Sequence, residues 1–381
     1  MTTKILSATA VLLVLIILGM VIFLHLSPAA VPEPTQPIQT DAHPETVFQT
    51  ESPTETILQT EPETAPPTEP APEEFLLSFA GDCCLANLKG WSENQHFIGT
   101  VGDDYSYPFA AVQEYFANDD CTFINLECVF TDSNRAAVKK FVFKGPVAYT
   151  QILTQGSVEF ANVANNHTLD YGEEGYADTA AALDEASIPY AHDGDTRVFT
   201  TASGLTIGVY ADTYPVELDG LSEKVEAMRA AGAELIVAAL HWGQEYYYKP
   251  NEEQVSLGHA AIDAGVDIVY GTHPHVLQPI EEYKGKYIYY SLGNFAFGGN
   301  TNPTDKDSAI LQQTVIREPD GTIRLGELTI IPCSVSSRSD RNDFQPTPLE
   351  PDTKAYERVL SKLDGSYGKT KISVTYRPEL G

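Results

Sequence analysis

The chain has 381 residues and a formal net charge of −30, with 53 acidic against 23 basic residues. Its first 74 residues contribute ten acidic residues and one basic residue, so the rest of the chain still carries −21. A chain this acidic is repelled by nucleic-acid phosphates and by anionic lipid, which excludes non-specific binding to either. The length allows two ordinary domains, but the first 74 residues lack a globular composition. We therefore expect one large domain.

The first predicted element is a membrane span over Ile5–Leu24. This run is apolar apart from one Ser and one Thr, and a helix rising about 1.5 Å per residue crosses the roughly 30 Å hydrocarbon core over such a length. The run exceeds the apolar part of a typical signal peptide, so we favour an uncleaved anchor; the alternative is cleavage near Ser27. Lys4 precedes the span, which predicts a single-pass protein of the cell membrane. Residues 1–26 are then the cytoplasmic N-terminus and anchor, and the following chain is extracytoplasmic.

Residues 27–74 are rich in Pro, Thr, Glu and Gln, and Gln-Thr recurs at 39–40, 49–50 and 59–60. This segment has too few apolar residues to build a core, so it predicts a disordered linker. Polyproline-like chain extends by about 3.1 Å per residue. The linker would therefore act as a spacer that carries the domain away from the bilayer through the cell wall.

Short apolar runs and helical stretches alternate through the following chain. The runs are rich in Val, Ile, Leu or Phe and end in turn or charge signals, as buried strands do. This alternation predicts a layered α/β core. The expected strands are Phe75–Ala80, Cys121–Ile124, Val158–Ala164, Leu205–Tyr210, Glu234–Leu240, Val266–Tyr270 and Tyr287–Tyr290, and the expected helices are Gly172–Ala186, Leu221–Ala231 and Asn251–Ala264.

Five of these strands are followed by a polar cluster. Ligands in α/β sheets collect beyond the carboxyl ends of the strands, so we expect the clusters to converge on one site. Carboxylates together with imidazoles predict a two-metal hydrolase. The clusters are Asp82, Asn125-Leu126-Glu127, Asn166-His167, His241-Trp242-Gly243 and His273-Pro274-His275.

The first two clusters offer carboxylate ligands. Residues two apart in extended backbone face the same way, so Asp82 and Cys84 are both candidates for one ion. A Cys84 thiolate would suit zinc or iron. The alternative is that Cys84 is a small buried hydrophobe, and five cysteines in all indicate no disulfide framework. Glu127 is a candidate bridge between two cations about 3.5–4 Å apart, its alternative being a turn or helix cap.

In the third cluster, Asn166 offers a neutral oxygen to a metal. His167 is placed to protonate a leaving oxygen or to orient a phosphate, and Asp170 is placed to orient His167. The alternative is an Asx-type turn beside a packed histidine.

The last two clusters supply histidines. His241 ends an apolar strand, where a hydrogen-bonded core histidine is the alternative to a ligand. Trp242 is a candidate wall of the site, with core packing as its alternative. Pro274 favours an extended His273, and the spacing to His275 then aims both imidazoles to one side, which suits two metal ligands.

Residues 336–381 begin with a polar stretch and predict a loosely packed C-terminal extension. A short closing helix is expected over Arg358–Leu363.

Taken in order, these motifs resemble those of the poly-γ-glutamate capsule synthesis protein CapA family, a branch of the calcineurin-like metallophosphoesterases. The likeness covers residues 75–335 and implies a layered, metallophosphoesterase-like β-sandwich flanked by helices. The motifs that carry it are Gly81-Asp82, Asn125-Leu126-Glu127, Ala164-Asn165-Asn166-His167 with Asp170-Tyr171-Gly172, His241-Trp242-Gly243, Gly271-Thr272-His273-Pro274-His275-Val276 and Ser291-Leu292-Gly293-Asn294-Phe295.

The resemblance also implies a role for each residue. The first ion would be held by Asp82 and His275, with Glu127 as the bridge, and the second by Asn166, His241 and His273, while His167 would be the general acid. The chain departs from the superfamily pattern in two places: it has Asp82-Cys83-Cys84 for Asp-x-His, and Glu127 for Asp. The mixed oxygen and imidazole set suits manganese, iron or zinc. Lys144, Trp242 and Asn294 are the expected substrate-binding residues.

Two functional hypotheses follow. The first is an extracytoplasmic, metal-dependent hydrolase of phosphoester type, acting on a cell-envelope or polymer-linked substrate. The second is a non-catalytic component of capsule assembly or export, which binds an anionic polymer while membrane-embedded capsule synthesis proteins make it. Lys144 would clamp a carboxylate in the second hypothesis, its alternative being a solvated lysine. Neither hypothesis involves nucleic acid.

Overall fold

The computed structural model describes residues 71–368. The expected membrane span, the expected linker up to residue 70 and residues 369–381 lie outside this range. Within it, no helix combines the length and the apolar character that crossing a bilayer requires.

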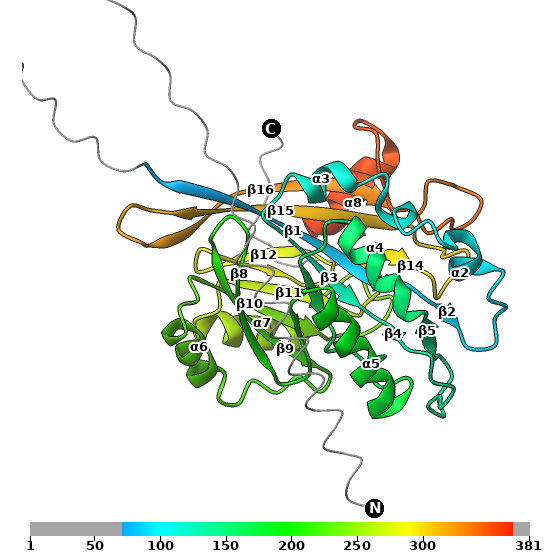
Figure 1. The fold of residues 1–381 in the computed structure, drawn as a ribbon. Helices are drawn as coiled ribbons and strands as arrows, with labels where there is room; N and C mark the ends of the chain where they lie inside the picture. The colour runs from blue at the N-terminus through cyan, green and yellow to red at the C-terminus, as the bar shows by residue number, and fades with distance from the viewer. Residues whose placement is uncertain (1–70, 369–381) are drawn as a thin grey trace, which may run out of the picture. The chain divides into compact units, whose positions relative to one another are not determined.

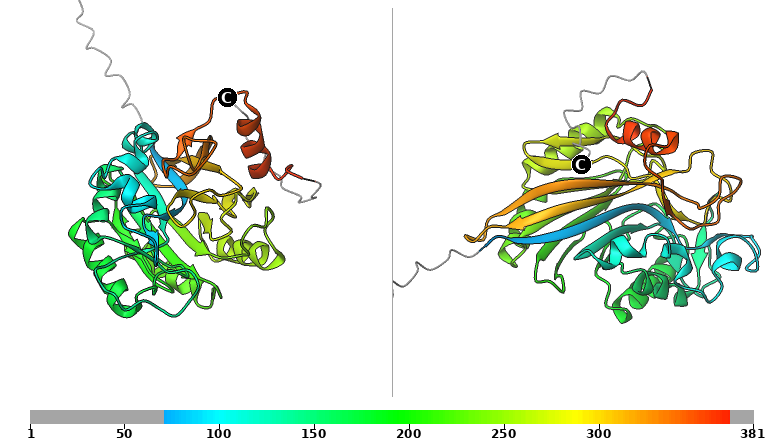
Figure 2. Two further views of the ribbon diagram at one scale, coloured as in Figure 1. Left: turned by 90° about the vertical axis from the view of Figure 1, so that its right-hand side faces the viewer. Right: turned by 90° about the horizontal axis from the view of Figure 1, so that it is seen from above.

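The described chain is a mixed α/β fold with two large sheets, as the alternation predicts. The first sheet has eight strands, and the long strands β1, β15 and β16 run side by side in it (Figure 2). In order across the sheet, its strands are β17 (Thr347–Pro348), β16 (Ile323–Ser334), β15 (Asp307–Arg317), β1 (Glu73–Cys84), β3 (Cys121–Leu126), β6 (Phe160–Asn162) and β7 (Tyr190–Ala191), with β14 (Asn294–Phe297) paired to β1.

The second sheet has six strands, four of which are parallel neighbours. Its order is β12 (Ile280–Tyr283), β13 (Lys286–Tyr289), β11 (Ile268–Thr272), β10 (Leu235–His241), β9 (Thr206–Thr213) and β8 (Thr196–Thr200). A small third sheet consists of β2 (Asn87–Leu88), β5 (Phe143–Gly145) and β4 (Val129–Phe130). Each strand expected from the sequence is present, with ends shifted by a few residues.

Helices cover the outer face of each large sheet (Figure 1). One group packs on the first sheet: α2 (His96–Val101), α3 (Gln113–Ala117), α4 (Thr150–Gln155) and α5 (Gly172–Glu185). The helices α6 (Leu221–Ala230) and α7 (Glu252–Asp263) pack on the second sheet. The three helices expected from the sequence are therefore confirmed as α5, α6 and α7.

The inner faces of the two sheets meet in a hydrophobic layer. Phe79 of β1 lies 5.6 Å from Tyr270 of β11 and 5.5 Å from Tyr289 of β13, measured between ring centroids. Such aromatic contacts favour offset and edge geometries at these separations. The layers are thus helices, sheet, sheet, helices, and the carboxyl ends of β1, β3, β10 and β11 approach one another at one edge.

The helix α8 (Lys354–Leu363) begins four residues before the expected closing helix. Its Val359 and Leu363 are buried in the layer between the sheets. Lys362 is also buried and pairs with Asp305 and Asp307 at 2.6 and 2.7 Å. This segment is therefore more closely packed than the loose extension expected.

Candidate metal centre

The polar residues expected at the strand ends converge on one site. Asp82 lies two residues before the end of β1, and Glu127 directly follows β3. His241 is the last residue of β10, while His273 directly follows β11. The first two belong to one large sheet and the last two to the other, so the site lies where the two sheets meet.

A β-bulge in β1 aims Asp82 into this site. Phe79 pairs with Phe123 of β3, but Asp82 pairs with Asn125, so β1 contains one extra residue between the two pairs. An extra residue reverses which side chains face each side of a sheet. Asp82 therefore faces the same side as Phe79, toward the second sheet. Gly81 permits this course, because a Cβ there would lie 2.1 Å from the carbonyl oxygen of Gly293.

Glu127 has a buried carboxylate without a hydrogen-bond partner for either oxygen. Its Oε1 lies 3.6 Å from Nε2 of His275, 3.8 Å from Nε2 of His167 and 4.0 Å from Nε2 of His241. Burial raises the pKa of Glu127 well above its ordinary value. An isolated buried carboxylate is costly, whereas one that binds a cation is not. Three imidazoles around two unpartnered oxygens therefore fit a bridging metal ligand.

His241 and His273 form the second-ion half of the site. Nε2 of His241 lies 3.1 Å from Nδ1 of His273 and 3.2 Å from Oδ1 of Asn166. Burial, with added repulsion from His273 and His275, holds the pKa of His241 well below its ordinary value. The ring is thus neutral and keeps a nitrogen lone pair for a cation. With Glu127, these donors form the set expected for a second ion.

His275 and Asp82 form the first-ion half together with Glu127. Nδ1 of His275 lies 3.1 Å from Oδ2 of Asp82 and 3.0 Å from Oδ1 of Asn294. Burial alone would lower the pKa of His275, but Glu127 and Asp82 together raise it to about 10. A proton on His275 thus supplies the positive charge that a cation between the same groups would bring.

His273 is not extended, which corrects the expectation based on Pro274. Its φ is 97° and that of His275 is 57°, both in the left-handed region that side chains rarely adopt. The Pro274 carbonyl accepts a hydrogen bond from the Tyr246 amide at 2.8 Å, which helps to hold this turn. Backbone strain of this kind persists where the surroundings enforce it and clusters at functional sites.

Asp170 lies beside His167, as expected, with Oδ2 2.8 Å from Nδ1 of the imidazole. The Phe143 amide donates to the same oxygen at 2.5 Å, and Lys139 forms an ion pair with the other. Lys139 Nζ also donates to the Asn166 carbonyl at 2.6 Å. Burial lowers the pKa of His167, which Asp170 opposes. The pair therefore orients the His167 Nε2 toward Glu127.

Cys84 is not among the ligand groups within residues 71–368. It is fully buried in the core beneath helices α2–α5. Burial and a hydrogen bond with the Cys128 thiol raise its pKa well above the ordinary value, which disfavours the thiolate a metal needs. All five cysteines are buried and free.

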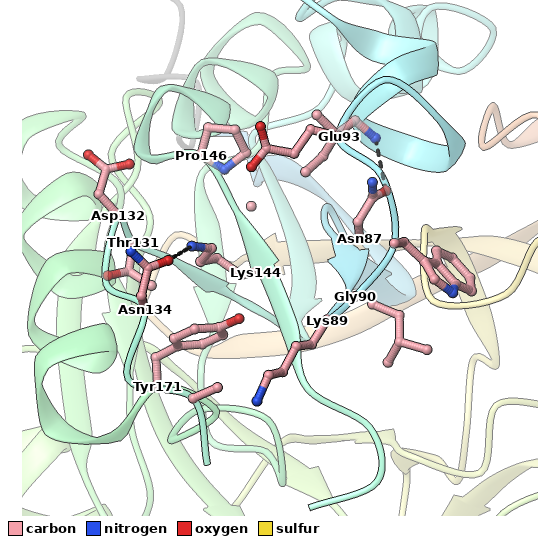
Figure 3. A pocket seen from close by; sticks show the side chains of 15 residues that line it. Asn87, Lys89, Gly90, Glu93, Thr131, Asp132, Asn134, Lys144, Pro146 and Tyr171 are labelled. Atoms are coloured by element: carbon pink, nitrogen blue, oxygen red, sulfur yellow. Dashed lines mark hydrogen bonds between the residues drawn. The ribbon is translucent and has the colours of Figure 1, made fainter. Parts of the chain in front are cut away.

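Trp242 and Lys144 are also placed away from the ligands. Trp242 is 1% exposed, and its indole nitrogen donates to the Tyr290 carbonyl at 2.9 Å in the core. Lys144 lines a separate cavity of about 570 Å³ beside the small sheet (Figure 3). Its ammonium donates to the Ser133 carbonyl at 3.0 Å and lies 3.3 Å from Oδ1 of Asn134. Asn294, by contrast, reaches the site through His275.

Several site residues were missed by the sequence reasoning. Asn125 donates to Asp82 at 2.9 Å and accepts from Asn162 and Asn165 at 3.1 and 3.2 Å, so an amide network fixes the Asp82 carboxylate. The Asn-Leu-Glu and Asn-Asn-His motifs contain part of this signal. Glu245 lies near His273 and His275, with the ligand atoms of all three within 4.8 Å of one another. Nothing in its local sequence singled it out.

Comparison with known proteins shows which family this sequence matches. Residues 76–299 match the family model described as bacterial capsule synthesis protein PGA_cap. The capsule biosynthesis protein CapA of Bacillus anthracis is 29% identical over 269 residues, 63% of this chain and 64% of that protein, just under two thirds of its length. The PGA biosynthesis protein CapA of Bacillus subtilis is 29% identical over 331 residues, 76% of this chain and 83% of that protein. Among solved structures, the NAD nucleotidase of Haemophilus influenzae has a TM-score of 0.41 at 12% identity, covering 77% of this chain and 63% of that chain.

Proposed function

Because the chain belongs to the bacterial capsule synthesis protein family PGA_cap, a calcineurin-like phosphoesterase-type family, we propose that it is a metal-dependent hydrolase in capsule biosynthesis. The bond we propose is a phosphoester of an envelope or polymer-linked substrate. The observation that carries this proposal is the buried, unpartnered Glu127 carboxylate with three imidazole nitrogens within 4.0 Å. A structural carboxylate would have hydrogen-bond donors around it instead.

The donor set fits two divalent cations. Asp82, Glu127 and His275 would hold the first, and Glu127, Asn166, His241 and His273 the second. Oxygen and imidazole donors suit manganese, iron or zinc. Bound there, such cations would supply Lewis-acid stabilisation of charge on a phosphoryl oxygen and a water of lowered pKa.

The protein groups beside the ligands would move the proton. An ionised Asp170 can only accept, so the hydrogen on His167 Nδ1 is directed to it and Nε2 is left facing the site. When the ring is doubly protonated, Nε2 also carries a proton and can give it to a leaving oxygen, which returns His167 to its neutral form. Lys139 forms an ion pair with the other Asp170 oxygen and so balances the charge of that carboxylate.

Two substitutions test the proposal. The substrates are aryl phosphomonoesters and phosphodiesters, assayed with Mn²⁺. Asp82→Asn and His273→Ala should each abolish turnover while circular dichroism stays unchanged. An exposed surface variant, Glu226→Gln on α6, serves as the control. Undiminished turnover in both site variants would refute the proposal.

We also infer a membrane location from the apolar run Ile5–Leu24 and the single basic residue before it. The domain would then face outward, where capsule polymer is assembled with membrane-embedded partners. Protease added to intact cells should digest the domain. Protection of the domain in intact cells would contradict the inference.

A second candidate function rests on the cavity of Figure 3. Among residues 71–368, the partners of the Lys144 ammonium are neutral oxygens, and neither Lys89 nor Lys144 forms an ion pair. The positive charge of both is thus free for a carboxylate, although Glu93 and Asp132 also line the cavity. In this function the chain binds an anionic polymer without cleaving it. Saturable binding of polyglutamate that Lys144→Gln weakens would support it, and absence of binding would count against it.

A further inference from the structure

The two halves of the metal centre have unequal numbers of ligands. The second half has a carboxylate, two imidazoles and the Asn166 amide oxygen. The first half has only Asp82, Glu127 and His275, because the Cys84 side chain is fully buried in the core beneath helices α2–α5. Transition-metal ions in proteins take four or more ligands. The first half therefore has three protein donors, and a fourth position is open to water or to a further side chain.

Glu245 lies beside His275 of the first half and His273 of the second half. One of its carboxylate oxygens is within 4.8 Å of the ligand nitrogens of both His273 and His275. The carboxylate is solvent-exposed, whereas Asp82 and Glu127 are fully buried. Glu245 thus adds an exposed carboxylate next to His275, the residue that it shares with the group of Asp82 and Glu127.

The segment that carries Glu245 is attached to the histidine turn at both ends. The Trp242 amide donates to the Thr272 carbonyl at 3.0 Å, and the Tyr246 amide donates to the Pro274 carbonyl at 2.8 Å. Gly243, with φ of 80°, packs so closely on Gln254 that a Cβ would lie 2.5 Å from its side chain. These contacts fix where Glu245 stands.

Resting on the function proposed above, we propose that Glu245 is a metal ligand, closing the first ion's site from the solvent side where Asp-x-His would have supplied a histidine. The first site then has three carboxylates and one imidazole, whereas the second has one carboxylate, the Asn166 amide oxygen and two imidazoles. Carboxylate-rich sets select harder cations than imidazole-rich sets do. The first site should therefore prefer Mn²⁺ and exchange it readily, since Glu245 is exposed.

Metal binding tests this directly. The 381-residue chain is stripped with a chelator and titrated with Mn²⁺, and free Mn²⁺ is followed by electron paramagnetic resonance. The wild type should bind two ions per chain. Glu245→Gln should weaken one of them by more than about 100-fold, beyond the roughly 10–100-fold loss typical of groups that only support a ligand. Cys84→Ser and the charge-matched control Glu226→Gln should both bind as the wild type does.

Cobalt gives an independent readout. Thiolate ligation of Co²⁺ produces a near-ultraviolet sulfur-to-metal charge-transfer band, which should be absent here. Its presence, or loss of a site in Cys84→Ser but not in Glu245→Gln, would overturn the assignment. Two ions in the wild type with an unchanged Glu245→Gln isotherm would overturn this inference alone. A wild type that binds no ion would overturn it together with the proposed function. Circular dichroism of each variant confirms folding.

Discussion

Glu127→Gln should cancel most of the stabilisation that Mn²⁺ gives the wild type. A ligand that binds only the folded state at 100 times its Kd stabilises by about 2.7 kcal/mol. For a domain of this size class, 1 kcal/mol corresponds to about 2–4 °C in Tm. One filled site should therefore raise the wild-type Tm by roughly 5–10 °C. The variant lacks the shared carboxylate of both halves and should shift by less than about 2 °C.

The same substitution should change the chelated protein little. It removes a carboxylate whose burial is costly and introduces an amide that is also left without partners. His275 keeps Asp82 at 3.1 Å in either case. We therefore expect the two chelated proteins to agree within about 1 kcal/mol in free energy of unfolding.

The pH dependence gives a further check. Because burial raises the folded-state pKa of Glu127 above 4.5, ionisation disfavours the folded state, and the chelated wild type should lose stability as the pH rises above that value. Glu127→Gln should lose less over the same range. Thermal scans with chelator and with excess Mn²⁺ measure these quantities. Equal Mn²⁺ stabilisation of both proteins would show that Glu127 holds no ion.

Three further variants separate chemistry from packing. Lys139→Met should lower turnover about tenfold with unchanged Mn²⁺ affinity, because the wild-type lysine pairs with Asp170 beside the proposed proton donor His167. A weaker Mn²⁺ affinity of the variant in the titration would contradict this. Trp242→Phe should leave KM unchanged and lower the free energy of unfolding by on the order of 2 kcal/mol, since the variant loses core volume and the hydrogen bond to Tyr290. A raised KM in steady-state assays would show instead that Trp242 contacts the substrate. Lys362→Met should cost on the order of 2 kcal/mol in denaturant unfolding at neutral pH, because Asp305 loses its lysine partner and Asp307 keeps only Arg358. Because its cationic partners outweigh burial and lower the pKa of Asp307 below 3.8, the wild type should lose the corresponding stability as the pH falls below that value; a wild-type stability that is flat over this range would refute the pairing.

The strands and the convergence of their polar ends could be predicted because burial leaves a strong pattern. Runs such as Leu235–His241 are fully buried, and the carboxyl ends of parallel strands necessarily share one edge. The small sheet was missed, because strands of two or three residues such as β2 and β4 carry no periodicity. The strand β15 was also missed, since Gln312 and Gln313 interrupt its apolar character.

The residue geometry within the site was less accessible. The alternation of side chains along an extended strand predicted that Asp82 and Cys84 face the same side. The bulge before Asp82 and the irregular pairing after it break this alternation. A residue before proline usually has an extended backbone, but this prediction is wrong for His273, because tertiary contacts hold it in the left-handed region. Lys139 and Glu245 meet the site through loops distant in sequence. No local pattern reports such contacts.

The site draws its donors from both large sheets, Asp82 and Glu127 from one and His241 and His273 from the other. A shared cation would act as a cross-link between two halves that otherwise meet through side-chain packing such as that of Phe79 on Tyr270. Mechanical pulling on the two sheets should then meet a metal-dependent resistance. Conversely, a substitution in the packed layer that lets one sheet slide on the other would lower the affinity for the cation without changing any ligand.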